Sequence, residues 1–167
     1  MRLTRAGEYA VRCTLYLASK NSGRVISRKE ISREMDIPGQ FLTKIAQQLA
    51  KAGILEIVQG ARGGYRLLAS PATLSLLDVI EVIEGELFLN DCVLRPDSCF
   101  RSRTCSVHRV WEKARDQLRE ILGEATMEKL LHEENCLQGA IGIYGGEGSA
   151  VSNILLEKDL LKGKEVS

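Results

Sequence analysis

Long hydrophobic runs are missing from this 167-residue sequence, and aromatic residues make up only 5% of it. No apolar stretch approaches the roughly 18 residues that a membrane span needs, so we expect no membrane partner. Residues 1–5 lack the apolar core of a signal peptide, which predicts a cytoplasmic location. With 44% hydrophobic and 27% charged residues, the composition predicts a globular, helix-rich chain.

The residue patterns of common enzymes are missing as well. The sequence shows no paired carboxylates, no nucleophile with a neighbouring base and no phosphate-binding loop. It also contains no internal repeats. We therefore predict that the protein is not an enzyme.

The net charge of +1 conceals an uneven distribution along the chain. Residues 1–70 carry 12 Lys and Arg against 5 Asp and Glu, which leaves +7. Residues 71–167 carry 11 Lys and Arg against 17 Asp and Glu, which leaves −6. A basic segment attracts phosphate, and an acidic one keeps a protein soluble. The distribution is therefore compatible with a first half that binds nucleic acid.

The first half shows the order of elements that is typical of a winged helix-turn-helix. Apolar spacing and capping residues predict helices over residues 4–20, 27–35 and 38–52. Two short apolar runs on either side of the Gly-rich residues 59–64 predict a β-hairpin. We therefore predict a mainly α fold, in which a winged helix-turn-helix domain with a β-hairpin wing precedes a long dimerisation helix.

The third predicted helix offers one apolar and one polar face. Its buried stripe is predicted to consist of Phe41, Leu42, Ile45 and Leu49. The opposite face carries Gln40, Thr43, Lys44 and Gln47. Such side chains can read base edges in the major groove, although an ordinary solvated helix face looks the same. We favour the DNA interpretation because a Gly-rich hairpin follows, with Arg62 placed at its tip to enter a minor groove. Phosphate contacts are expected from Arg2, Arg5, Arg28 and Lys29.

The second half predicts a helix over residues 74–85, a loop over 86–104 and a long amphipathic helix from about 105. The apolar stripe of that last helix follows a domain that is already complete, so we expect it to form the seam of a homodimer. Domain boundaries are predicted at residues 1–72, 73–135 and 136–167. The last range is Gly-rich and is predicted to be a flexible tail.

Three cysteines and a histidine lie close together in the sequence, in the pattern Cys92-x6-Cys99-x5-Cys105-x2-His108. Thiolate and imidazole ligands suit an iron–sulfur cluster and also zinc. The pattern is not the C-x2-C knuckle of structural zinc sites, so we favour a cluster and keep zinc and redox-reactive thiols as alternatives. The remaining candidates are predicted to be a core thiol, Cys13, and two incidental residues, His132 and Cys136.

The opening residues Met1-Arg2-Leu3-Thr4…Gly7-Glu8-Tyr9-Ala10-Val11, the wing 60–65 (GARGGY) and the three cysteines resemble the IscR/NsrR/RirA group of bacterial winged-helix regulators. The similarity covers about residues 1–135. It implies an iron–sulfur cluster on Cys92, Cys99 and Cys105.

The same resemblance implies two candidates for the fourth ligand. IscR-like members use a histidine three residues after the last cysteine, which is the position of His108 and implies a 2Fe–2S cluster. NsrR-like members use an acidic side chain from the partner's first helix, which is the position of Glu8 and implies a 4Fe–4S cluster. We favour His108. Two departures from the group are a first cysteine gap one residue longer than usual and Thr43, which replaces a glutamate that helps IscR to select operators.

These observations predict a dimeric repressor whose affinity for its operator is controlled by a cluster that senses iron, redox or nitric oxide status. The dimer would place its recognition helices about one DNA turn apart on pseudo-palindromic double-stranded DNA. One alternative is a zinc- or thiol-dependent winged-helix regulator without a cluster. Another is a protein-interaction partner with no role at DNA.

Overall fold

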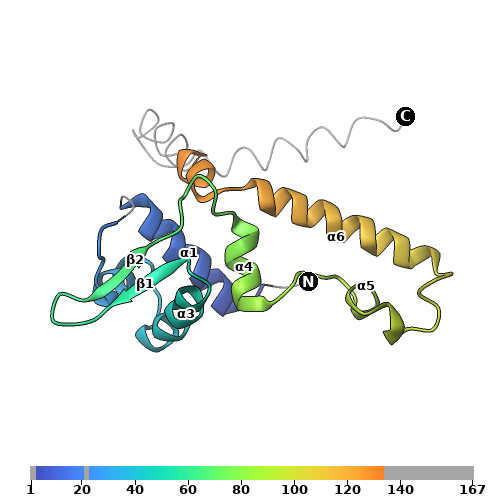
Figure 1. The fold of residues 1–167 in the computed structure, drawn as a ribbon, viewed down its shortest axis with the longest axis horizontal. Helices are drawn as coiled ribbons and strands as arrows, with labels where there is room; N and C mark the ends of the chain where they lie inside the picture. The colour runs from blue at the N-terminus through green and yellow to red at the C-terminus, as the bar shows by residue number, and fades with distance from the viewer. Residues whose placement is uncertain (1–2, 21–22, 134–167) are drawn as a thin grey trace, which may run out of the picture. The chain divides into compact units, whose positions relative to one another are not determined.

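The computed structural model describes residues 3–20 and 23–133 (Figure 1). Its elements are α1 (Arg5–Ser19), α2 (Arg28–Glu34), α3 (Gly39–Lys51), β1 (Leu55–Val58), β2 (Gly64–Leu67), α4 (Leu76–Glu84), α5 (Asp91–Leu94), the 3-10 helix η1 (Pro96–Ser98) and α6 (Ser106–Glu124). Residues 127–133 are also helical. The mainly helical fold with an antiparallel hairpin confirms the predicted class. Arg2, Cys136 and the predicted tail lie outside the described residues.

Helix ends follow the capping signals in the sequence. Ser27 accepts a hydrogen bond from the backbone N–H of Glu30 at the start of α2, and Ser75 forms a complete capping box at the start of α4. The Glu30 carboxylate does not complete the box at α2, because it accepts the hydroxyl of Tyr16 from α1 at 3.1 Å. Gly85, with φ 82°, ends α4 in a backbone conformation that favours glycine. None of the described helices is long and apolar enough to cross a membrane.

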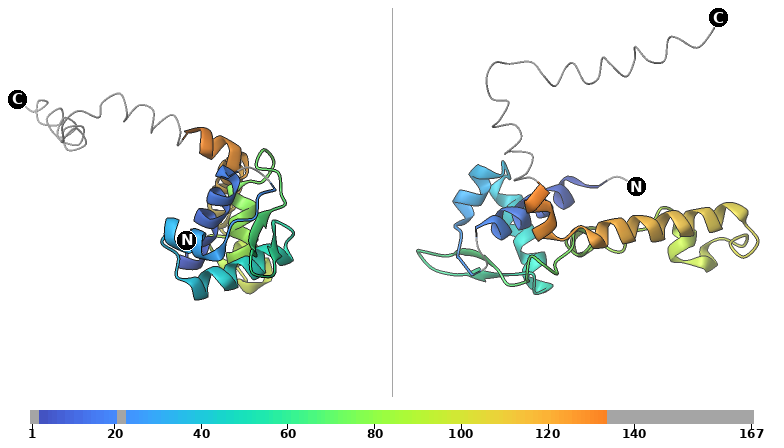
Figure 2. Two further views of the ribbon diagram at one scale, coloured as in Figure 1. Left: turned by 90° about the vertical axis from the view of Figure 1, so that its left-hand side faces the viewer. Right: turned by 90° about the horizontal axis from the view of Figure 1, so that it is seen from above.

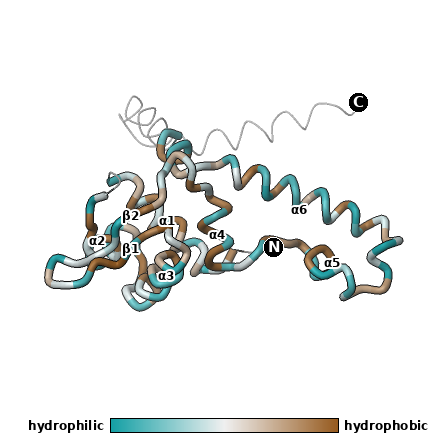
Figure 3. Tube along the Cα trace, in the orientation of Figure 1, coloured by the Kyte–Doolittle hydropathy of each residue, from teal (hydrophilic) through white to brown (hydrophobic). Residues whose placement is uncertain are grey.

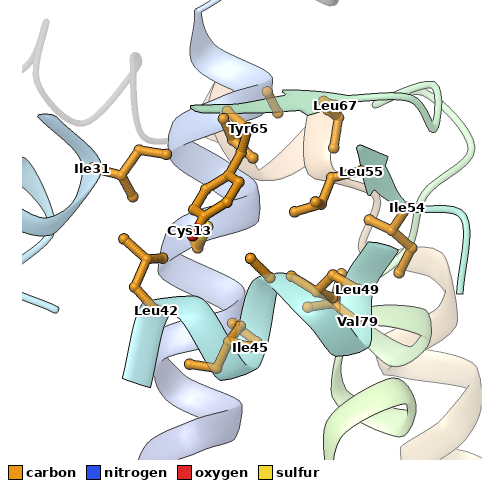
Figure 4. Packing of buried hydrophobic residues seen from close by; sticks show 14 of the residues in the cluster. Cys13, Ile31, Leu42, Ile45, Leu49, Ile54, Leu55, Tyr65, Leu67 and Val79 are labelled. Atoms are coloured by element: carbon orange, nitrogen blue, oxygen red, sulfur yellow. The ribbon is translucent and has the colours of Figure 1, made fainter. Parts of the chain in front are cut away.

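The hydrophobic core lies between α1, α3, the hairpin and α4 (Figure 4). Leu42, Ile45 and Leu49 point from α3 into this core, as predicted. Phe41 does not, since its side chain is 42% exposed and packs edge-on against Tyr9 with ring centroids 5.9 Å apart. The prediction for Phe41 was wrong because Phe41 lies at the edge of the stripe, about 100° around the helix from Leu42, where its side chain still reaches solvent.

The β-hairpin is held to the segment before α2 by a backbone bridge. Ile57 pairs with Tyr65 inside the hairpin, while Tyr65 also exchanges two backbone hydrogen bonds of 2.9 Å with Ile26. The turn of the hairpin projects away from the helices (Figure 2). The wing is therefore fixed at its base and free at its tip.

Gly64 is the residue that lets β2 and the Ile26 segment come together, so Gly64→Ala should destabilise the fold. A Cβ at Gly64 would lie 2.0 Å from the carbonyl oxygen of Ile26, a backbone atom that cannot rotate away. We expect a loss of about 1–3 kcal/mol or more in the free energy of unfolding, measured by urea denaturation. Gly39→Ala is the matched control, because a Cβ there meets nothing within 4 Å. Equal stability of the two variants would contradict the prediction.

The segment 86–104, predicted as a loop, contains α5 and η1. That prediction was wrong in part because single turns of helix are too short to show apolar periodicity.

Arg119 of α6 forms an ion pair with Glu81 of α4, and Glu81 also accepts the backbone N–H of Leu87 at 2.9 Å. The helix α6 and the start of the cysteine-bearing segment are thus both attached to α4.

Hydrophobic residues recur between hydrophilic ones along the long helix α6 (Figure 3), and much of this apolar stripe is exposed. Val107, Val110 and Ile121 are 51%, 60% and 66% exposed, and Trp111 is 36% exposed. Leu118 and Leu122 instead line an apolar hollow between α6, α1 and α4. Part of the stripe therefore packs on its own domain, whereas the rest faces outward.

Candidate DNA interface and cysteine segment

The polar face of α3 lies opposite the core, as predicted. Gln40, Lys44 and Gln47 are exposed on it and spaced three or four residues apart, which places them on one side of the helix. Thr43 shares this face but is half-buried. Its hydroxyl donates to the carbonyl oxygen of Gly39 at 2.9 Å and accepts from Nη1 of Arg28 at 3.4 Å. Thr43 therefore makes its hydrogen bonds within the protein.

The tip of the wing presents an exposed Arg62. The turn is closed by a hydrogen bond of 2.9 Å from the backbone N–H of Gly63 to the carbonyl oxygen of Gly60. Gly60 has φ 107°, and a Cβ at Gly63 would lie 2.3 Å from the carbonyl oxygen of Val58. These glycines make a narrow turn that could approach DNA closely. Arg28 and Lys29 are exposed on α2, and Arg5 is exposed on α1.

Four of the five predicted metal ligands lie in the segment that runs from α5 through η1 to the first turn of α6. Cys92 belongs to α5, Cys99 follows η1, Cys105 precedes the first residue of α6, and His108 lies in the first turn of α6. The three cysteine side chains are half-buried, whereas His108 is only 8% exposed. His108 is thus a buried polar residue whose two ring nitrogens need partners.

Both nitrogens of His108 have such partners. Nδ1 lies 3.5 Å from Sγ of Cys92, and Nε2 lies 3.4 Å from a carboxylate oxygen of Glu112. Glu112 was not among the predicted site residues, although its i,i+4 spacing from His108 on one helix was a signal that could have found it. The fold thus pairs the imidazole with one thiol and one carboxylate.

Within the described residues, no three Cys, His, Asp or Glu side chains are gathered closely enough to hold a metal ion. The donor set still fits a cluster chemically, since residues 92–108 supply three thiols and an imidazole. Cys13 does not belong to this set, because burial raises the pKa of its thiol to about 12 and keeps it protonated. Glu8 is exposed on α1 and borders the apolar hollow next to Leu118 and Leu122.

The arrangement of helices, wing and cysteines is also found in known proteins. The family model Rrf2, described as iron-dependent transcriptional regulator, matches residues 3–133. The chain belongs to the Rrf2 family. This membership confirms the resemblance seen in the sequence and makes the protein a DNA-binding transcriptional regulator rather than an enzyme.

Individual Rrf2 proteins agree with this assignment. The transcriptional regulator NsrR of Bacillus licheniformis is 28% identical over 136 residues, which cover 81% of this chain and 95% of the relative. The solved structure of T. potens IscR superposes with a TM-score of 0.65 at 26% identity and covers 80% of this chain and 88% of its own. The structure of CymR, the global cysteine regulator of B. subtilis, gives a TM-score of 0.63 at 25% identity, with coverage of 78% and 95%.

Proposed function

We propose that this Rrf2 protein is a dimeric repressor whose operator affinity is controlled by an iron–sulfur cluster on Cys92, Cys99 and Cys105, with His108 as the fourth ligand. The observation that carries the proposal is the position of His108 between Cys92 and Glu112. The cluster would be of the 2Fe–2S type and would supply sensitivity to iron, redox or nitric oxide status.

The environment of His108 is typical of a ligating histidine. Such a residue commonly donates the N–H of one ring nitrogen to a carboxylate, which leaves the lone pair of the other nitrogen for the metal. Here Nε2 faces the Glu112 carboxylate and Nδ1 faces the Cys92 thiol. The low exposure of His108 also restricts water at this position. Glu8 is the rival fourth ligand, and it would serve from the partner subunit.

At DNA, the proposal places α3 in the major groove and Arg62 of the wing in a minor groove. Gln40, Lys44 and Gln47 would meet base edges, and Lys29 and Arg2 would contact phosphates. A pseudo-palindromic operator would accommodate the two recognition helices of a dimer. The exposed apolar residues of α6 would form the seam between the two copies, because water-exposed apolar patches on helices mark interaction surfaces.

A physical route from the cysteine segment to the DNA interface runs through α4. Glu81 of α4 holds the backbone of Leu87, five residues before Cys92, and also holds Arg119 of α6. The helix α4 packs in turn on α1 and α3 of the winged domain. A rearrangement of the cysteine segment would therefore act on the dimer helix and the recognition helix together.

His108→Ala tests the proposed ligand set. The full-length variant, purified without oxygen and reconstituted with iron and sulfide, should lose or shift the visible absorption of the wild type. Glu112→Gln should weaken cluster binding by about 10- to 100-fold, which is typical for a residue that orients a ligand. His132→Ala is the matched control, because His132 is exposed and far along the chain. A normal spectrum for His108→Ala combined with an altered one for Glu8→Ala would assign the fourth ligand to Glu8.

A thiol-dependent regulator without a cluster is the second candidate. In the described part of the chain, the thiol of Cys92 lies close to His108, but no three Cys, His, Asp or Glu side chains lie close enough together to bind a metal ion. This arrangement favours the thiol-dependent candidate. The similarity to structures of CymR, one of which is the oxidized form of the Staphylococcus aureus protein, also supports it. A protein that stays colourless after reconstitution and still loses operator affinity on oxidation would establish this candidate.

A further inference from the structure

We propose that Arg28 of α2 reads a base edge in the major groove and that Thr43 of α3 positions it there. The sequence predicted different roles, with Thr43 as a base reader and Arg28 as a phosphate contact. This inference rests on the proposed DNA interface and does not depend on the cluster.

Thr43 has no hydroxyl proton left for a base. A threonine hydroxyl offers one donor and two acceptor lone pairs. The proton goes to the carbonyl oxygen of Gly39 at 2.9 Å, and a lone pair receives Nη1 of Arg28 at 3.4 Å. The hydroxyl of Thr43 therefore acts as an anchor that holds the guanidinium of Arg28 over the recognition face of α3.

A third element, β2, holds the segment that leads into Arg28. Tyr65 of β2 is only 4% exposed. The backbone of Tyr65 is bonded to Ile26, two residues before Arg28. The wing therefore holds the backbone next to Arg28, and Thr43 holds the guanidinium of Arg28.

The free edge of the guanidinium suits guanine. Arginine carries five N–H donors in a planar fork, and the bond to Thr43 uses one nitrogen. The side chain remains exposed on the side of α3 that carries Gln40 and Lys44. Arginine held in this way can bond O6 and N7 of guanine together, which is the commonest specific contact in the major groove.

The experiment starts from an operator that the wild-type, full-length dimer selects from a randomised DNA duplex library. Fluorescence polarisation then measures the affinity of wild type, Arg28→Lys, Thr43→Val, Thr43→Ser and Lys29→Ala for that duplex and for each of its single-base variants, at several salt concentrations. Arg28→Lys keeps the charge but loses the fork. Thr43→Ser keeps the hydroxyl, whereas Thr43→Val removes it at equal size.

We expect Arg28→Lys to lose about 5- to 150-fold of discrimination at one G·C pair with little change in the salt dependence of binding. Thr43→Val should reduce discrimination at the same G·C pair, and Thr43→Ser should keep that discrimination. Lys29→Ala should weaken binding evenly across sequences and lower the salt slope by about one.

Two results would overturn the proposal. If Arg28→Lys discriminates between bases as well as the wild type does, Arg28 contacts a phosphate and not a base. Relaxation by Thr43→Val at a different base pair would make Thr43 an independent reader. Failure of the proposed DNA interface would look different, because the wild type itself would then enrich no sequence. Circular dichroism and thermal melting confirm that each variant is folded before its affinity is interpreted.

Discussion

Cys92→Ala should abolish the visible absorption of the reconstituted protein and make operator affinity insensitive to oxidants or nitric oxide. Cys92 is the thiol that contacts His108, so its loss removes one ligand and leaves another without its neighbour. In the wild type we expect the signal to change operator affinity by about 5- to 150-fold, the usual range of coupling between two sites. In the variant this ratio should fall to about one, whereas specific DNA binding itself persists. Spectra and polarisation titrations before and after oxidant treatment measure both effects.

The matched control for Cys92→Ala is Cys136→Ala, which removes a thiol outside the Cys92–His108 pattern. This control should keep both the spectrum and the response. A full response in Cys92→Ala would contradict the proposed ligand set. A loss of response in both variants would point to general thiol chemistry instead of a defined cluster site.

Val110→Glu combined with Ile121→Glu should prevent formation of the proposed dimer. Operator binding should then weaken by about 100-fold or more, because a dimer that binds two linked half-sites gains about that much affinity over a monomer that binds one. Both side chains are more than half exposed on the apolar stripe of α6, so the wild-type residues contribute little to the fold of a single chain. Burying two carboxylates in an apolar interface is strongly unfavourable, which is why the effect on assembly should be large. Light scattering gives the mass in solution, and polarisation gives the affinity.

Arg109→Glu serves as the control for this pair, because Arg109 is exposed on a different face of the same helix. It should remain dimeric. Persistence of the dimer in the double glutamate variant would show that another surface joins the copies. A monomeric control would show that added negative charge alone, rather than burial in an apolar seam, is responsible.

Local signals in the sequence predicted the fold well where they act within a few residues. The serine cap at Ser27 and the glycine at Gly85 placed helix ends correctly, because each signal acts between close neighbours in the chain. The cap at Ser75 was not predicted, and α4 begins two residues later than expected. Phe41 was misplaced because apolar character alone does not decide which side of a stripe faces the core. The segment 86–104 was predicted as a loop because a single helical turn has no period to detect.

Contacts between distant residues were harder to predict at the candidate site. The spacing of Cys92, Cys99, Cys105 and His108 indicated a ligand set, but not that Nδ1 of His108 lies 3.5 Å from Sγ of Cys92, 16 positions away in the chain. The hydrogen bond between Arg28 and Thr43 joins residues 15 positions apart, and no local sequence pattern predicts it. The first pair is fixed by the packing of α5 on α6, and the second by the packing of α2 on α3. They therefore become visible only when the elements are assembled in three dimensions.

Whether the cluster sets operator affinity can be decided in a single titration. Protein purified without oxygen is titrated with an oxidant or chelator while visible absorbance and polarisation of a labelled operator are followed in the same sample. If the cluster controls DNA binding, operator affinity changes in step with the loss of absorbance, and Cys92→Ala shows neither change. A wild-type protein that binds its operator with the same affinity before and after its absorbance is lost, or that stays colourless after reconstitution with iron and sulfide, would contradict it.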